Sequence, residues 1–245
     1  MDEGYEEAVR ARRAEINDRI EAACRRAGRD PLEVTVIAVS KTVGPEEVAA
    51  AARAGYDRFG ENRPQELVRK IGALAEMGAG ALSFDMIGNL QKNKINAVLG
   101  RVGLIHSISS LHLAEAVSSR QERRREEGAA DGPQDVLLEV NVSGEETKSG
   151  FSPDGLRAAV DALRGLRGIR VRGLMTMAPR GDKGIARATF AGLRELAIEI
   201  SEVTPGQPLE ELSCGMSEDF EVACEEGSTI VRLGRVALDP AFALE

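Results

Sequence analysis

The chain has 245 residues, of which 42% are hydrophobic and 29% charged, as is typical of a soluble globular protein with a substantial core. Its net charge of −8, without a stripe of lysines and arginines, argues against a nucleic-acid or anionic-membrane partner, because phosphate groups require a clustered positive surface. Three cysteines and two histidines lie in no metal-ligand spacing, which argues against a zinc site and favours a reduced, cytoplasmic protein.

The first residues predict an amphipathic helix over about 5–27. Val9, Ile16, Ile20 and Ala23 fall near one face of it. The acidic start of the chain is unlike a signal peptide, and no apolar run approaches membrane-spanning length. Residues 34–39 then form a nearly continuous β-branched and apolar run, which is typical of a parallel strand buried on both faces.

From this run onward, predicted strands and helices alternate. The strands are 34–39, 56–60, 82–87, 102–108, 136–142, 169–175, 209–213 and 229–233. Between them, helices are predicted over 64–76, 91–98, 110–127 and 183–202. Three more helices are predicted to begin at Pro45, after Ser152 and near Ser217. Eight strand–helix units without a break in composition predict an α/β protein with a closed (β/α)8 TIM barrel. We expect one domain over residues 1–245, with the helix in residues 1–30 packing on the barrel.

Barrels of this kind carry their active sites at the carboxyl ends of the strands. Almost every predicted strand ends in polar residues or glycine, and Lys41 stands out because it follows a dry, apolar strand. It could simply begin a surface loop. Alternatively, poor solvation could lower the pKa of its amine and make it a nucleophile toward carbonyl groups. The residues alone do not separate an aldolase lysine from a cofactor lysine.

Short motifs lie at the strand ends in a fixed order along the chain. They are Ala38–Thr42, Phe59–Asn62, Ile87–Gly88, Ile105–Ser107, Val140–Glu146, Lys148–Phe151, Gly173–Pro179, Gly215–Ser217, Gly227–Thr229 and Val231–Gly234. In this set the chain resembles the pyridoxal-phosphate homeostasis proteins. The resemblance implies the alanine-racemase N-terminal barrel, which is PLP fold type III without the C-terminal β-domain. It also implies that pyridoxal 5′-phosphate (PLP) is bound as a covalent aldimine on Lys41.

The resemblance assigns further residues to cofactor binding. Ser217 would offer a hydroxyl to the phosphate at a helix N-terminus, although a plain N-cap serine fits the same position. Gly234 and Arg235 would add backbone N–H groups, and glycine permits a close approach of the chain. Asn62 would hydrogen-bond the 3-oxygen of the cofactor or neighbouring side chains.

Arg232 matches the family arginine that is expected to face the pyridine nitrogen. A permanent positive charge there disfavours protonation of the nitrogen and weakens the ring as an electron sink. The residues alone also allow an ordinary salt-bridged arginine. We expect His106 to be a structural hydrogen-bonding residue rather than a base. Lys148, the rival lysine for PLP, should stay protonated beside Glu145 and Glu146.

The resemblance therefore implies a non-catalytic PLP-binding protein that acts in vitamin B6 and amino-acid balance. We expect a monomer with no catalytic residue and no metal, and PLP-dependent apoenzymes are candidate recipients of the cofactor. An amino-acid racemase is the alternative, but it needs a tyrosine opposite the lysine, and the chain has only Tyr5 and Tyr56. A class I aldolase without cofactor would leave Ser217 and Gly234 unexplained unless its substrate were a phosphosugar.

Three places depart from the family pattern. Phe84-Asp85-Met86 stands where the family usually has an aromatic-histidine pair before Ile-Gly. The stretch 235–240 differs from the usual small-residue ending, and Cys214 replaces a common methionine. These differences bear on the contacts of the ring and on the phosphate loop.

Overall fold

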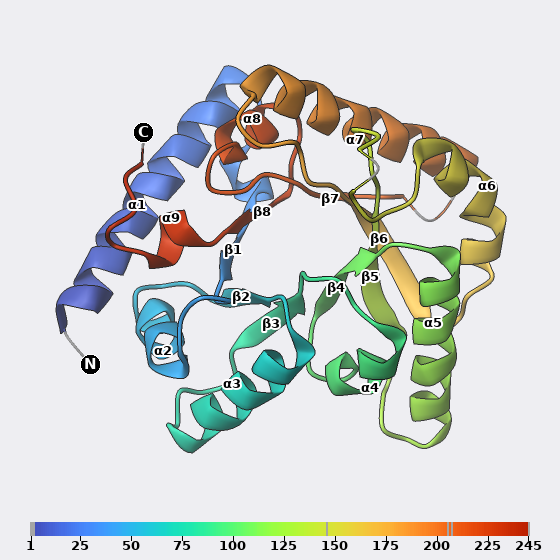
Figure 1. Cartoon of the computed structure of the whole chain (residues 1–245), viewed down its shortest axis with the longest axis horizontal. Coiled ribbons are helices and arrows are strands. Elements are labelled where there is room, and N and C mark those ends of the chain that lie inside the picture. The colour runs from blue at the N-terminus through green and yellow to red at the C-terminus, as the bar shows by residue number, and fades with distance from the viewer. Residues whose placement is uncertain (1–2, 146, 205, 207, 245) are drawn as a thin grey trace.

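The computed structural model describes residues 3–145, 147–204, 206 and 208–244. Its strands form one closed parallel barrel in chain order, which confirms the predicted fold. The strands are β1 Thr35–Val39, β2 Arg58–Glu61, β3 Ser83–Met86, β4 Leu104–Ile108, β5 Gln134–Glu139, β6 Ile169–Met175, β7 Glu211–Ser213 and β8 Ile230–Leu233. Figure 1 shows these strands in the middle of the molecule, with helices around them.

A helix connects each strand to the next, one further helix precedes the first strand and another follows the last. The helices are α1 Glu3–Arg26, α2 Pro45–Arg53, α3 Pro64–Glu76, α4 Ile95–Val98, α5 Leu111–Glu126, α6 Pro153–Arg164, α7 Lys183–Val203, α8 Phe220–Glu225 and α9 Arg235–Leu238, with 3-10 turns η1 Pro31–Glu33 and η2 Lys92–Lys94. A proline in the first turn starts α2, α3 and α6, where its missing N–H has no helical partner to lose. Among the described residues, no helix is long and apolar enough to cross a membrane.

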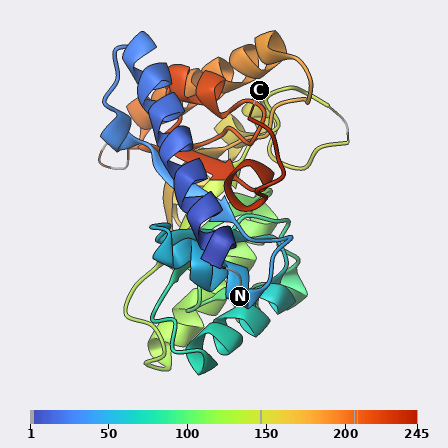
Figure 2. The same ribbon diagram turned by 90° about the vertical axis from the view of Figure 1, so that its left-hand side faces the viewer.

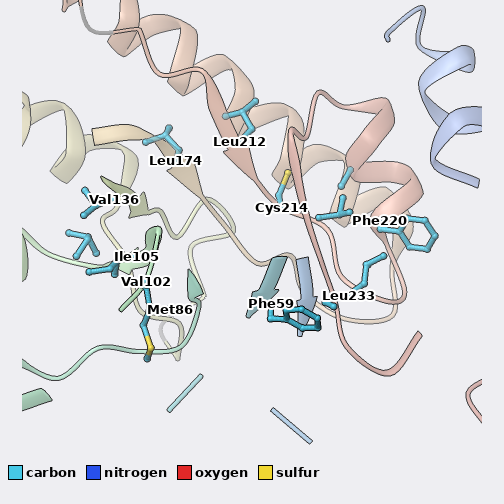
Figure 3. Close-up of a cluster of buried hydrophobic side chains, with 14 of the residues drawn as sticks. Phe59, Met86, Val102, Ile105, Val136, Leu174, Leu212, Cys214, Phe220 and Leu233 are labelled. Atoms are coloured by element: carbon cyan, nitrogen blue, oxygen red, sulfur yellow. The ribbon is translucent and has the colours of Figure 1, made fainter. Parts of the chain in front are cut away.

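The alternation of side chains along each strand produces two cores. Ile37 and Val39 of β1 join one buried cluster with Leu137 of β5. Because β1 and β5 are not neighbours in the barrel wall, these side chains can meet only inside the barrel. Ala38, which lies between them in sequence, belongs to the second cluster, between barrel and helices. Part of this outer cluster, including Phe59, is drawn in Figure 3.

The first helix lies along the C-terminal part of the chain rather than inside the ring of strand-connecting helices. It packs against α2, α8 and α9. Figure 2 shows α1 running past the red C-terminal segment. The Tyr5 hydroxyl donates a 2.9 Å hydrogen bond to the Leu238 carbonyl, and Arg12 donates one of 2.8 Å to the Phe242 carbonyl. These bonds hold α9, and the strand end before it, against the amino-terminal helix.

Most element boundaries shift by one or two residues from the sequence prediction, and three differences change the local structure. The helix expected near Ser217 begins at Phe220, because residues 216–219 first form a turn in which the Asp219 carboxylate accepts a 2.6 Å hydrogen bond from the Met216 N–H. The fifth strand ends at Glu139, and Val140 pairs instead with Phe151 across the following loop. The short helix expected over 91–98 is divided into η2 and α4.

Candidate functional site

Lys41 directly follows Ser40 at the carboxyl end of β1. Ser40 is fully buried, and its backbone N–H donates a 2.9 Å hydrogen bond to the Gly60 carbonyl, so the chain is fixed just before the lysine. Lys41 itself is exposed, as the surface-loop alternative predicts, and the alternative of a poorly solvated amine is wrong for this structure. The lysine is an accessible amine on a rigid support.

Behind Lys41 lies a buried ion pair that the sequence analysis missed. Lys70 of α3, only 1% exposed, pairs with the carboxylate of Glu61 at the end of β2. The Ser40 hydroxyl donates a 2.6 Å hydrogen bond to the same carboxylate. A signal for Lys70 existed, because it shares the apolar face of α3 with Leu67 and Leu74 at helical spacing. A lysine on such a stripe requires a buried acidic partner.

Asn62 is half-buried and follows β2, next to the end of β1 in the barrel wall. The chain at Gly88, after β3, approaches it so closely that a Cβ on this glycine would lie 2.2 Å from the Asn62 carbonyl oxygen. No other residue type fits at Gly88 without moving the chain. The close approach fixes the backbone of Asn62 at the strand end.

Arg232 lies on β8, in register with Ile37 of the neighbouring β1. Its guanidinium donates hydrogen bonds of 2.6 Å to the Ser213 hydroxyl and 3.1 Å to the Thr176 carbonyl. Burial lowers the pKa of Arg232 from its ordinary value, but an arginine remains charged near neutral pH. Among the described residues no carboxylate lies within ion-pair distance of it, so a simple salt-bridged arginine is not what the structure shows.

Ser217 and Gly234 come together at the start of α9. The Ser217 hydroxyl accepts a long hydrogen bond of 3.4 Å from the backbone N–H of Val236, in the first turn of that helix. Ser217 is not the N-cap of α8, because Asp219 takes that position. The first N–H groups of any helix lack an acceptor within the helix, so this turn presents donors beside a hydroxyl. Helix α9 lies within residues 235–240, the stretch that departs from the family pattern.

The neighbouring protein atoms do not require a glycine at position 234. A Cβ at this position would make only ordinary contacts, the nearest at 3.6 Å from Val39. The Arg235 side chain turns to the surface, where it pairs with Glu218 at 2.7 Å and lies 4.9 Å over the Phe242 ring. Only the backbone of Arg235 is therefore left to serve a ligand at the strand ends.

Two further expectations concern His106 and Lys148. His106 is fully buried on β4 and hydrogen-bonds Asp85 and Ser213, and burial lowers its pKa. Lys148 pairs with Glu145 at 3.1 Å and donates a 3.0 Å hydrogen bond to the Met177 carbonyl. Glu146, its second expected partner, lies outside the described residues.

The structure thus gathers an exposed lysine, a buried guanidinium with no carboxylate partner in the described part of the chain, and a hydroxyl with helix-start N–H groups at the carboxyl ends of β1, β7 and β8. A hollow also lies away from these strand ends. It has a volume of about 740 Å³, is lined by Leu163, Arg167 and Ile200 among others, and opens between α6 and α7 near the amino end of β6. Its lining carries none of the residues singled out from the sequence.

Comparison with known proteins agrees with this arrangement. The alanine racemase N-terminal domain family matches residues 6–238. A curated pyridoxal phosphate homeostasis protein of Aquifex aeolicus is 40% identical over 224 residues, which are 91% of this chain and 94% of that protein. A crystal structure of an unknown protein from Bifidobacterium adolescentis superimposes with a TM-score of 0.87 at 39% identity and covers 97% of both chains.

A second solved structure, PipY of Synechococcus elongatus with PLP bound, gives a TM-score of 0.80 at 32% identity and covers 94% of this chain and 99% of that one. The barrel and its strand ends therefore define a protein of the alanine racemase N-terminal class. Within that class, the chain belongs to the family of pyridoxal phosphate homeostasis proteins.

Proposed function

We propose that this chain binds PLP as a Schiff base on Lys41 and, without catalysing a reaction, buffers the cofactor or delivers it to PLP-dependent apoenzymes. The observation that carries the proposal is Arg232, a buried guanidinium without an ion-pair partner among the described residues, on the strand next to Lys41. Buried charges are normally paired, so an unpaired one favours a ligand. The PLP found in PipY, a relative over nearly the whole chain, supports the choice of ligand.

The residues present fit three groups of PLP, namely its aldehyde, its phosphate and its pyridine nitrogen. The accessible amine of Lys41 suits the aldehyde. Ser217 and the first N–H groups of α9, after Gly234, suit the phosphate, which prefers hydroxyl and backbone donors of this kind. Arg232 suits the pyridine nitrogen, to which it can donate but from which it cannot accept a proton.

The same residues favour storage over catalysis. When bound, PLP supplies an electron sink whose strength depends on protonation of its ring nitrogen. Arg232 disfavours that protonation because two positive charges would lie side by side. A racemase would also need a tyrosine base, but the Tyr5 hydroxyl bonds the Leu238 carbonyl and Tyr56 is buried beneath α1 beside Arg13. Neither tyrosine of this chain can act at Lys41 without rearrangement.

Borohydride reduction of the protein incubated with PLP, followed by peptide mapping, tests the proposal. We expect a single pyridoxyl adduct on Lys41, loss of the yellow absorbance in Lys41→Ala, and no change in Lys148→Ala. Protein that stays colourless and unlabelled would end the PLP assignment, and an adduct on Lys148 would end the assignment to Lys41. Racemisation of alanine and other amino acids by the PLP-loaded protein would show that it is an enzyme instead.

We also propose that the protein is a cytoplasmic monomer. All three cysteines are free and buried, as a reducing compartment allows. Sedimentation equilibrium tests the monomer, since a mass well above 26.2 kDa would contradict it. Transfer is tested by mixing PLP-loaded protein with a PLP-dependent apoenzyme. Activation faster than spontaneous PLP dissociation supports delivery.

A further inference from the structure

A chain of hydrogen bonds crosses the inside of the barrel and ends on Arg232. The Asp85 carboxylate lies 3.3 Å from Nε2 of His106, and Nδ1 of His106 lies 2.9 Å from the Ser213 hydroxyl. That hydroxyl accepts the 2.6 Å hydrogen bond from Arg232. His106 is on β4 and Ser213 on β7, so their contact must pass through the barrel interior. We call Asp85, His106, Ser213 and Arg232 the interior chain.

Asp85 can act in this chain only as an acceptor. Its carboxylate already accepts hydrogen bonds of 2.7 Å from Nε of Arg58 and 3.1 Å from the backbone N–H of Leu104. The guanidinium of Arg58 forms an ion pair with this carboxylate at 2.7 Å, and a carboxylate paired in this way has only acceptor sites to offer. His106 must therefore carry its proton on Nε2 and donate it to Asp85.

This tautomer determines every other donor in the interior chain. With its proton on Nε2, His106 has a bare Nδ1, which accepts the proton of the Ser213 hydroxyl. The serine oxygen then turns its lone pairs toward Arg232. Arg232 donates to Ser213, Ser213 to His106, and His106 to Asp85, so all the donors point the same way. Burial lowers the pKa of His106 and so preserves the neutral ring that this order requires.

The interior chain matters because little else holds Arg232. Besides the Ser213 hydroxyl, the described hydrogen-bond partner of the guanidinium is the Thr176 carbonyl at 3.1 Å. Glu139 and Asp219 act on it only from beyond ion-pair distance. The orientation of the guanidinium therefore depends on whether the Ser213 oxygen is presented to it, and that depends on the proton of His106.

We propose that Asp85 is a positioning residue for Arg232: through His106 and Ser213 it fixes the guanidinium that faces the ring nitrogen of bound PLP. This role presupposes the proposed function, because it concerns the binding of PLP. Without a carboxylate acceptor at position 85, His106 could move its proton to Nδ1 and donate to Ser213. The serine proton would then turn elsewhere and compete with Arg232 for space.

The tautomer can be measured without cofactor. The chain has only two histidines, and His112 is largely exposed, so nitrogen NMR spectra resolve the ring of His106 without crowding. We expect the wild-type protein to show His106 protonated on Nε2 alone near neutral pH. A proton on Nδ1 would overturn the proposal, whatever the variants do.

A double-mutant cycle then tests the link to PLP. Asp85→Asn should move the His106 proton and weaken PLP binding by about tenfold, the cost of one hydrogen bond to a charged group. Ser213→Ala should weaken binding by a similar factor and leave the tautomer unchanged. The double variant should be no weaker than either single variant, because the two residues act in one series.

The control is Asp135→Asn, which removes the same charge from a strand aspartate that also pairs with an arginine, Arg170, but on the exposed side of β5. It should bind PLP like the wild type. The proposal would be overturned if the losses of PLP affinity in the two single variants multiplied in the double variant. It would also be overturned if Asp85→Asn and Asp135→Asn bound PLP with equal affinity. If the wild type itself bound no PLP, the proposed function would fail, whereas the NMR result would still report on the interior chain.

Discussion

The ammonium group of Lys70 donates a 2.5 Å hydrogen bond to the backbone carbonyl of Ser40, the residue before Lys41. The same ammonium group pairs with Glu61, and both side chains are almost fully buried. A helix on the outside of the barrel thus holds the strand end that carries the proposed PLP lysine.

Removal of Lys70 should therefore destabilise the protein strongly. Lys70→Met leaves the Glu61 carboxylate buried without a countercharge, which typically costs about 3–5 kcal/mol. Urea unfolding measures the loss. In Glu61→Leu combined with Lys70→Met, much of the stability should return, because the buried charge is gone.

A matched control lies one residue away on α3. Arg69 pairs with Glu66, and both side chains are exposed. Arg69→Met should cost at most about 1 kcal/mol, as exposed ion pairs do. Equal losses in Arg69→Met and Lys70→Met would show that burial of the pair has no special weight.

Gly215 is required by its backbone and by its neighbours. Its φ is +92°, and a Cβ would lie 2.6 Å from Cβ of Ala223 on α8. Gly128 also has a positive φ of +72°, but a Cβ there would meet nothing within 4 Å. Gly128→Ala should cost about 1–2 kcal/mol of unfolding free energy from backbone strain alone.

Gly215→Ala should cost clearly more than Gly128→Ala, because the clash with α8 adds to the strain. It should also weaken PLP binding, since Gly215 sets the path of the chain toward Ser217. Urea unfolding and PLP titration of both variants provide the measurements. A Gly215→Ala protein as stable as Gly128→Ala would disprove the clash.

The three cysteines should not react with thiol reagents in the native protein. Burial raises the pKa of Cys24, Cys214 and Cys224, that of Cys214 to about 11. A thiol reagent must reach the sulfur and reacts with its ionised form, the thiolate. Burial prevents the first, and a raised pKa prevents the second. A colorimetric thiol count should give no reactive cysteine in native buffer below about pH 9 and all three in denaturant. Rapid reaction of any of them in native buffer would contradict this burial.

The barrel could be predicted from the sequence because the alternation of strands and helices is strong and is set by residues close together in the chain. Apolar runs such as 34–39 and 169–175 are bounded by polar strand ends, and proline fixes helix starts such as Pro64 and Pro153. Ser217 was placed at the start of the wrong helix. Its neighbour Asp219 forms a turn that delays α8, while Gly234 starts α9 beside it.

Contacts between distant strands were beyond prediction from one sequence. His106 and Ser213 are 107 positions apart, and only closure of the barrel brings them together. Asp85 could be seen as a departure from the family pattern, but its partners could not be named. The exposure of Lys41 was left open between two alternatives, because an apolar strand says nothing about how far the next residue lies from the barrel mouth.

The pH dependence of stability should reveal the buried His106. Its pKa in the folded protein lies below the ordinary value of 6.5, chiefly because of burial, and the charges of Arg232 and Arg58 oppose the favourable effect of Asp85. Above about pH 6.5 the ring is neutral in both states and has no effect on the pH slope. Below that pH the unfolded chain binds a proton that the folded protein refuses.

The free energy of unfolding should therefore fall with decreasing pH, by at most about 1.4 kcal/mol per pH unit from this group. His106→Asn should remove that part of the slope between about pH 6.5 and pH 5.5, although the variant is less stable near pH 7.5 because the interior chain is broken. His112→Asn, at a side chain that is 71% exposed, should keep the wild-type slope. Urea unfolding at these pH values separates the variants. If His106→Asn and His112→Asn had the same slope, His106 could not be the neutral, buried link between Asp85 and Ser213.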